Sequence, residues 1–416
     1  MKSWYDFINA KDEAVGVWEI VGDDGKVVAS GDLPDLDIAP RGEKVFTLSL
    51  PATLPVAESA RHPKQEYWLN VRFLTRADMP WAKKGHELGW EQWEFPSRPG
   101  PVTIADMGTW PLTMRETGQV IRFSSDRVAV VFDRLRGTIG SYSYNGVKIL
   151  DRGPMPDFWR AMTDNDLGAW KAAVNNARRD PKLDVTVWRH AGASWSVKDI
   201  QATRLSDTSA RVVVQADLPL VGGKYTMTYT IEGNGEVAVE GAYTPGAGPV
   251  AMIPRAGMEL VVSPGFENIR WLGRGPAETY IDRQFEPIGT YASTVRQQWV
   301  EYSRPQENGN KTDVRWVELT NDRGAGIRAI GEPLLSVGAM HATKADVEQA
   351  EYTFQLPARQ ETYLNLDLKQ MGIGGIDSWS ANAWPMDPYR IHGDQPFRYR
   401  YRLVPVTGNA RPAATR

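Results

Sequence analysis

The chain has 416 residues, of which 42% are hydrophobic and 24% charged, and its formal net charge is −3. This balance gives no basic surface for nucleic acid, and no apolar run approaches the ~20 residues that span a bilayer. The opening "KSWYDF" lacks the apolar core of a signal peptide, and the absence of cysteine excludes disulfides and thiolate metal sites. We therefore expect two or three domains with sizeable cores, no nucleic-acid or membrane partner, and a cytoplasmic location.

Residues 1–95 alternate apolar and polar positions over several short stretches. "GVWEIV", "KVVASG", "KVFTLSL" and "EYWLNVRFLTR" each follow the period of two that is typical of strands, and turn residues separate them. About six short strands in so few residues predict a small β-sandwich.

A proline-rich linker is predicted over residues 96–114, because Pro96, Pro99, Pro101 and Pro111 remove backbone donors and fix φ. At the other end, residues 406–416 are predicted to form a disordered tail.

Residues 115–405 resume the strand pattern and predict one large antiparallel β-sandwich. Asn145-Gly146 and Arg136-Gly137 mark hairpin turns, because they supply the positive φ angles that tight hairpins need. "KYTMTYTIEGNGEVAVEGAY" is the clearest strand pair, with four residues predicted to share one face: Tyr225, Met227, Tyr229 and Ile231.

A short helix is predicted in "DLGAWKAAVNNARRD". Trp170, Ala173, Val174 and Ala177 fall at helical spacing, and Asp166 is placed to cap the start. The simplest interpretation is a surface helix that decorates a sheet.

Several catalytic motifs are absent. There is no Gly-x-Ser-x-Gly nucleophile elbow and no phosphate-binding glycine loop, and the five histidines are too scattered for a zinc site. "GRGPAE" at residues 273–278 follows a strand but lacks the helix and the acidic residue of a dinucleotide motif.

Asp164 and Asp166 are the candidate carboxylate pair. Glycoside hydrolysis needs two carboxyl groups, one protonated and one ionised, and a turn could direct both into a cleft. The alternative is an Asp-rich turn whose side chains bond their own backbone.

Residues 304–316, "RPQENGNKTDVRW", are polar and rich in turn formers. Glu307, Asn308 and Asn310 could coordinate a ligand hydroxyl. They could equally satisfy buried loop backbone.

The stretch "MGIGGIDSWS", residues 371–380, is unusual because three glycines precede a tryptophan. Gly372, Gly374 and Gly375 permit backbone angles closed to other residues and allow close approach of another backbone. Asp377 can bond the backbone that follows it and stiffen the turn. Trp379 is then either a fixed ring for a ligand such as a sugar, or a ring that caps the sandwich edge.

Several motifs together resemble family 2 β-galactosidases. "FWRAMTDNDLG", "WLGRGPAETYIDR", "RPQENGNKTDVRW" and "MGIGGIDSWS" are similar to the C-terminal β-sandwich of that family, also found as a separate small chain. "WYDFINAKD", "DLDIAPRGEKVFTL" and "WAKKGHELGWEQWEFP" resemble the immunoglobulin-like domain that precedes it. The resemblance runs from about Trp4 to Pro405. It implies an immunoglobulin-like sandwich followed by a galactose mutarotase-like supersandwich.

The resemblance implies that the catalytic residues lie elsewhere. In that family the catalytic glutamates lie on a (β/α)₈ barrel, and the magnesium and sodium ligands lie mainly there as well. This sequence has no alternating βαβα run. We therefore expect no catalytic residue, metal site or cofactor in this chain. The implied partners are a galactoside or other carbohydrate and a barrel-bearing chain or domain, and assembly into a homo-oligomer is also expected.

The resemblance also assigns roles to individual residues. Trp379 matches a tryptophan that stacks on the sugar. Asp164, Asn165, Asp166 and Gly168 match a loop beside the active site that is expected to contact substrate. The loop-shaping residues implied around the tryptophan are Gly372, Gly374, Gly375 and Asp377.

Family members begin the immunoglobulin-like domain with one strand more than this chain contains. The expectation is a sheet edge left for a partner to cover, and the chain is interpreted as a fragment or a separately encoded subunit. The sequence leaves two alternatives open: a free-standing carbohydrate-binding module, and an autonomous glycosidase that uses the two aspartates.

Overall fold

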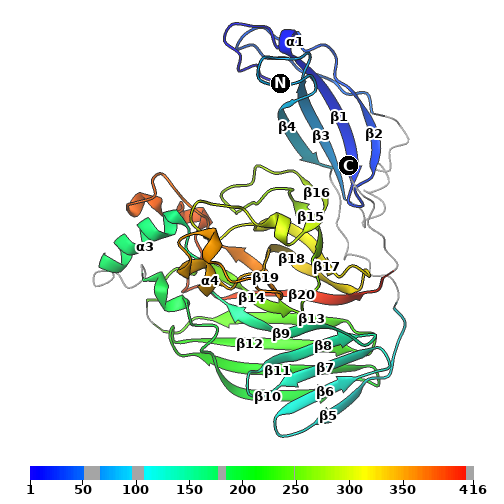
Figure 1. Cartoon of the computed structure of the whole chain (residues 1–416), viewed down its shortest axis with the longest axis vertical. Coiled ribbons are helices and arrows are strands. Elements are labelled where there is room, and N and C mark those ends of the chain that lie inside the picture. Colours follow the sequence, from blue (N-terminus) through cyan, green and yellow to red (C-terminus); the bar gives the residue numbers. More distant parts are fainter. Residues whose placement is uncertain (51–65, 96–106, 177–183, 248, 409–416) are drawn as a thin grey trace. The chain divides into compact units, whose positions relative to one another are not determined.

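The computed structural model describes residues 1–50, 66–95, 107–176, 184–247 and 249–408 (Figure 1). By its contacts, the chain divides into two compact units. The first comprises Met1–Ala105 with Pro287–Thr290, and the second comprises Asp106–Glu286 with Tyr291–Arg416.

The described part of the first unit is built on one antiparallel sheet with strand order β2-β1-β3-β4. Alternate residues of β1 are buried, as the period of two predicts. Its core contains Trp18, Ile20, Tyr67 and Val71. The elements are α1 (Ala10–Glu13), β1 (Ala14–Gly22), β2 (Val27–Asp32), β3 (Tyr67–Thr75) and β4 (Glu87–Glu94).

The strand predicted over residues 44–50 is wrong. These residues adopt no strand, and the pairing that the structure describes next to them is an isolated bridge between Lys2 and Glu43. Phe46 and Leu48 pack against the core while Val45 is 90% exposed. The alternating pattern therefore reflects alternating burial of a segment that pairs with no strand among the residues that the structure describes.

The second unit contains one long antiparallel sheet that folds back on itself. Its main strand order is β10-β11-β12-β13-β20-β18-β19-β14-β9-β8-β7-β6-β5, and β15, β16 and β17 branch from it at β18. The strands are β5 (Thr113–Glu116), β6 (Val120–Ser124), β7 (Val128–Asp133), β8 (Thr138–Tyr144), β9 (Val147–Asp157), β10 (Ser196–Arg204), β11 (Ser209–Leu218), β12 (Gly223–Glu232), β13 (Val237–Thr244), β14 (Arg255–Val262), β15 (Asn268–Arg274), β16 (Ile288–Thr294), β17 (Lys311–Thr320), β18 (Gly326–Met340), β19 (Thr362–Gln370) and β20 (Phe397–Val406).

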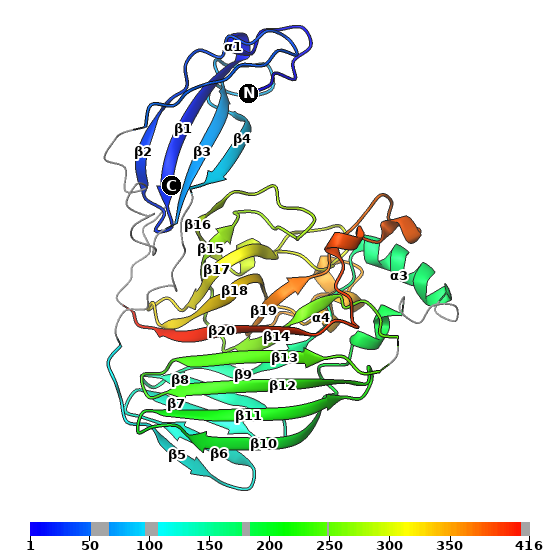
Figure 2. The same ribbon diagram turned by 180° about the vertical axis from the view of Figure 1, so that it is seen from behind.

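The two arms of this sheet form the two layers of a sandwich. Figure 2 shows strands β10–β13 in front of strands β6–β8. Between the layers, Phe132 of β7 meets Tyr229 of β12 edge-to-face, with ring centroids 5.3 Å apart. The buried Tyr142 hydroxyl donates to the Gly235 carbonyl over 2.7 Å. The all-β sandwich that the sequence predicts is confirmed.

The predicted hairpin turns are also confirmed. Asn145 and Gly146 join β8 to β9 with φ angles of 48° and 77°, which is the geometry that favours Asn-Gly. The strand pair β12–β13 buries the four side chains predicted to share a face: Tyr225, Met227, Tyr229 and Ile231.

Helices lie outside the sandwich. The predicted helix is α3 (Asp164–Asn176), which begins two residues before Asp166. Ala177, the last residue of its predicted apolar stripe, lies outside the described residues. The other helical elements are α4 (Lys344–Gln349) and the 3₁₀ turns η2 (Val185–Trp188), η3 (Arg296–Gln298), η4 (Thr353–Gln355), η5 (Ala381–Ala383) and η6 (Asp387–Tyr389).

The predicted linker and tail are described only in part. Residues 107–112 form no strand, and β5 begins at Thr113, inside the predicted linker. Strand β20 ends at Val406. The remaining residues of both predictions, 96–106 and 409–416, lie outside the described residues. The domain boundaries given by the sequence stay predictions.

Candidate functional site

The two sequence stretches predicted to form a site lie side by side. We call residues 371–380, which follow β19, the glycine loop. In Figures 1 and 2 helix α3 lies beside the orange segment that contains this loop. Contact is closest at Gly168, where an added Cβ would lie 2.3 Å from the Ser378 carbonyl oxygen and 2.7 Å from the Trp379 nitrogen. Only glycine permits this approach.

The base of the glycine loop is held by a buried arginine. The side chain of Arg160 is 0% exposed, and its Nε and Nη2 donate to the two carboxylate oxygens of Asp166 over 3.0 and 2.8 Å. The same guanidinium donates to the carbonyl of Gly372 over 2.9 Å and to that of Met371. Burial is the largest single influence and lowers the pKa of Arg160, but the charge and the hydrogen bonds of Asp166, together with the nearby charge of Glu307, outweigh it and the pKa is raised.

Asp166 also forms the start of α3. Its Oδ2 accepts a hydrogen bond from the Thr163 nitrogen, and its own nitrogen donates to the Thr163 hydroxyl, each over 3.1 Å. This reciprocal pair is a capping box, with Thr163 as the cap. The carboxylate of Asp166 is buried, and both of its oxygens are already used.

Two further side chains form hydrogen bonds with the backbone of the glycine loop. The Asn165 amide donates to the carbonyls of Ile373 and Gly374 over 2.9 and 3.2 Å. The Asp282 carboxylate accepts from the nitrogens of the same two residues over 3.0 and 2.8 Å. Sequence reasoning missed Asp282, because no local pattern in "WLGRGPAETYIDR" indicates a contact with a loop 91 residues away.

The glycines have the backbone conformations expected of loop-shaping residues. Gly374 and Gly375 have φ angles of +67° and +114°, which side-chain-bearing residues rarely adopt. Gly372 lies against Asp282, whose Oδ2 would be 2.5 Å from an added Cβ.

The tip of the loop is held by Asp377. Its Oδ1 accepts from the nitrogens of Trp379 and Ser380 over 3.1 and 2.9 Å, and its Oδ2 accepts from the Ser380 hydroxyl over 2.6 Å. This is the side-chain-to-backbone turn predicted from the sequence. The hydrogen bond from Ser380 is the main reason that the pKa of Asp377 is lowered.

Trp379 projects from this turn. Its side chain is 78% exposed, and among the described residues its ring has no hydrogen bond or ring contact. Ile376 and Met386, on the same stretch of chain, are 86% and 67% exposed. A large apolar ring on a held backbone is available for contact at low entropic cost.

Asp164 lies at the surface beside this assembly. Its backbone nitrogen donates to Oε1 of Gln306 over 3.1 Å, and the Gln306 amide donates back to Oδ2 of Asp164 over 3.2 Å. These bonds connect the start of α3 to residues 304–316.

A buried ionic cluster lies in the same unit. Arg255 pairs with Asp367 and Glu307 at 2.8 and 2.9 Å, and all three side chains are at most 1% exposed. The amide of Gln370, the last residue of β19, donates to Glu307 over 3.1 Å. Burial raises the pKa of Asp367 well above its usual range, against the attraction of Arg255.

Side chains of residues 308–311 form hydrogen bonds with backbone groups of neighbouring loops. Asn308 accepts from the Val300 nitrogen over 3.0 Å, and Asn310 donates to the Thr279 carbonyl over 2.8 Å. The alternative that these two asparagines form hydrogen bonds with loop backbone is therefore confirmed. Lys311 donates to the Gly309 carbonyl over 2.8 Å, and burial lowers its pKa to about 8.

The described residues offer no metal-binding group of three or more His, Asp or Glu side chains. Of the helices that the structure describes, none combines the length and apolar character required to cross a membrane.

Comparison with known proteins matches both units. Residues 124–403 match the family described as "Beta galactosidase small chain", and residues 1–96 match "Beta-galactosidase, domain 4". A β-galactosidase of Priestia megaterium is 30% identical over 374 residues, covering 89% of this chain and 34% of that protein. A β-galactosidase of Vibrio cholerae is 32% identical over 377 residues, covering 87% and 34%.

The fold and these matches together identify the family of the chain. The second unit is an all-β sandwich that carries a glycine loop and an exposed indole, and the chain belongs to the β-galactosidase small-chain family. It spans about a third of the length of the curated relatives it matches. A solved galactose 1-epimerase from Lactobacillus acidophilus is similar with a TM-score of 0.35 and 7% identity over 72% of this chain and 99% of that one, too loosely to support an argument.

Proposed function

We propose that this chain is the C-terminal part or small subunit of a family 2 β-galactosidase. In this proposal the catalytic glutamates and the metal ions of the enzyme are held by a barrel-bearing chain or domain. The present chain contributes the glycine loop to the rim of the galactoside-binding site. Trp379 stacks on the sugar, because the apolar face of a pyranose fits an indole.

The observation that carries this proposal is the exposed ring of Trp379 on an anchored loop. Because Trp379 is 78% exposed, its aromatic ring adds little packing energy to the stability of the fold. Its backbone is nevertheless held by Asp377 and contacted by Gly168. A ring that is held in place but left exposed is suited to a ligand.

The carboxylates near the loop favour a role in which this chain assists another chain's catalysis over a role as an independent catalyst. A glycosidase needs one carboxyl group as acid and a second as base or nucleophile. The Asp166 carboxylate is ion-paired with Arg160 and bonded to the Thr163 nitrogen, so it is not available to attack a sugar or to transfer a proton. Asp164 alone does not supply the pair.

Complementation tests the proposal. The purified chain is mixed with a barrel-bearing β-galactosidase chain that lacks this region, and hydrolysis of a nitrophenyl galactoside is followed. We expect activity from the mixture and none from this chain alone. Trp379→Ala should raise KM at least tenfold, whereas Trp379→Phe should restore part of the loss.

Trp4→Ala is the matched control, because Trp4 is 70% exposed and lies in the first unit. It should leave KM unchanged. Complementation by the Trp379→Ala chain with an unchanged KM would remove the ring from the site, and two chains that neither co-elute nor restore hydrolysis would refute the subunit role.

A further inference from the structure

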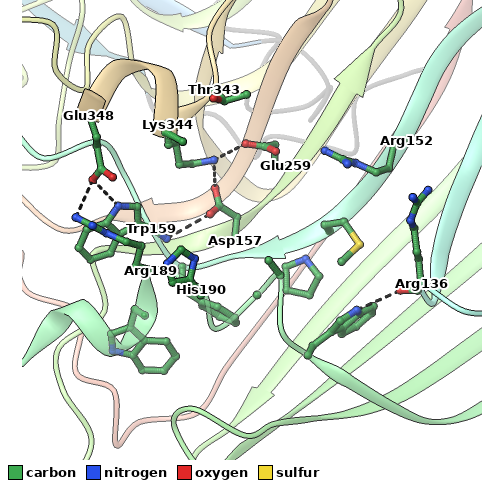
Figure 3. Close-up of a pocket in the computed structure, with 18 of the residues that line it drawn as sticks. Arg136, Arg152, Asp157, Trp159, Arg189, His190, Glu259, Thr343, Lys344 and Glu348 are labelled. Atoms are coloured by element: carbon green, nitrogen blue, oxygen red, sulfur yellow. Dashed lines mark hydrogen bonds and ion pairs between the residues drawn. The ribbon is translucent and has the colours of Figure 1, made fainter. Parts of the chain in front are cut away.

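A second candidate site is a pocket in the second unit (Figure 3). Its volume is about 490 Å³, within the range of small-molecule sites. The walls come from the end of β9, from the segment after η2, from Glu259 of β14 and from α4. Four cationic side chains and three carboxylates line it: Arg136, Arg152, Arg189 and Lys344, with Asp157, Glu259 and Glu348.

Each of the three carboxylates already has a partner within the protein. Asp157 is 2.9 Å from the Lys344 ammonium, and Glu259 pairs with the same group. Glu348 accepts from the Trp159 indole nitrogen over 2.8 Å and is 3.3 Å from Arg189. The negative charges of the pocket are therefore compensated before any ligand binds.

Two of the cations are not compensated in the same way. Arg152 makes no side-chain hydrogen bond or ion pair with any other described residue. Figure 3 shows its guanidinium pointing toward the side of the pocket that holds Glu259, with no interaction between them. Within the described part of the chain, the Arg136 guanidinium has one ion pair, with Asp133 at 3.7 Å, and its side chain is 61% exposed. An exposed pair at that distance contributes little.

We propose that this pocket binds a small hydroxylated anion, a sugar acid or a sugar phosphate, with its acidic group at Arg152 and Arg136. A guanidinium presents a fork of donors that matches a carboxylate or a phosphate. The hydroxyl groups of the ligand bond Lys344 and the carboxylates on the opposite wall, which retain unused acceptor positions. A neutral sugar would leave the excess positive charge unpaired.

Titration calorimetry on the full chain at low salt tests this proposal with three probes: galacturonate, galactose 6-phosphate and galactose. We expect at least one of the two anions to bind at least tenfold more tightly than galactose. Binding of both identifies the shared oxyanion as the recognised group, and binding of only one identifies which acid the pocket accepts. Affinity should fall as salt is added.

Variants locate the binding. Arg152→Gln should weaken anion binding at least tenfold, and Arg152→Lys should weaken it less. Arg211→Gln is the matched control, because Arg211 is exposed on β11 and lies outside the pocket. Thermal unfolding of each variant checks that it folds.

Three results would overturn the proposal: no heat with either anion, equal affinity for galactose, or unchanged anion binding in a folded Arg152→Gln protein. The proposal does not depend on β-galactosidase activity. Failure of complementation leaves it standing, and its own failure leaves complementation standing.

Discussion

The interior beside the glycine loop and the tip of the loop use polar groups in opposite ways. At the base, Arg160 and Asp166 are almost completely buried, and each charge is matched by a partner. At the tip, Asp377 is accessible to solvent, and its bonds with described residues all reach residues within five positions of itself. The base is fixed by contacts across the fold, whereas the tip is fixed by its own sequence.

This difference separates stability from binding. Removing one member of a buried pair leaves an uncompensated charge, which is costly to the whole unit. Removing an exposed hydrogen bond changes local order and little else. We therefore expect changes at the base to be measured by unfolding, and changes at the tip to be measured by loop dynamics and ligand affinity.

The largest effect is expected for Arg160→Met, which leaves the Asp166 carboxylate buried without its partner and frees the carbonyls of Met371 and Gly372. The free energy of unfolding in urea should fall by about 3–5 kcal/mol. The exposed Arg211→Met should change it by less than about 0.5 kcal/mol. A loss below about 1 kcal/mol in Arg160→Met would show that the base does not depend on this charge.

A second effect concerns Lys311, whose pKa burial lowers to about 8. Between pH 8 and the unfolded value of 10.5, the Lys311 side chain binds more protons in the unfolded chain than in the folded one, so its own contribution to stability should rise with pH across this window. The rise is at most about 3 kcal/mol. The difference in unfolding free energy between wild type and Lys311→Met, measured in urea at pH 7.5 and at pH 10, gives this contribution.

Lys311→Met should abolish this rise. The exposed Lys224→Met should retain it, because this variant loses one lysine but still contains Lys311. Parallel pH profiles for wild type and Lys311→Met would contradict the assignment to Lys311.

A smaller effect is expected for Gly168→Ala, which places a methyl group against the backbone of Ser378 and Trp379. Overpacking of this kind costs about 1–3 kcal/mol. Amide exchange should accelerate in residues 371–380 while strands β11–β13 keep their protection. Gly338→Ala is the control, since an added Cβ there meets nothing within 4 Å. Equal exchange in both variants would place the loop farther from α3 than the structure has it.

The smallest effect on stability is expected for Asp377→Ala. Global unfolding should be unchanged, while the amides of Trp379 and Ser380 exchange faster because they lose their common acceptor. Asp377→Asn keeps an acceptor oxygen and should restore much of the protection.

The pH dependence of this turn gives a further check. The pKa of Asp377 is lowered, so the turn is fully held above the usual aspartate pKa and is lost as pH falls through the folded value. Protection that is independent of pH down to pH 2 would contradict this account of the tip.

Local features of the fold could be predicted from the sequence. The Asn145-Gly146 turn, helix α3 and the Asp377 turn each depend on residues within a few positions of one another. Such signals are contained in short windows, where backbone preference and side-chain capping act directly. The family resemblance then placed Trp379 on a loop whose ring is exposed.

The contacts that position the loop could not be predicted in this way. Asp282 bonds a backbone 91 residues away, and Arg160 bonds carbonyls more than 200 residues away. Nothing in the sequence around Gly168 reveals that Ser378 packs against it. Even the strand pattern misled at residues 44–50, because alternating burial does not require a paired neighbour.

The position of β20 has a consequence for the order in which the molecule is made. Phe397–Val406 is an interior strand of the long sheet, with β13 on one side and β18 on the other. During synthesis, the ribosome must release these residues before the strands on the two sides can be joined. Until then, each half exposes an unpaired edge that can pair with another nascent chain. The completion of this unit is therefore set by the last strand to emerge, and translation speed near residue 400 should influence its yield.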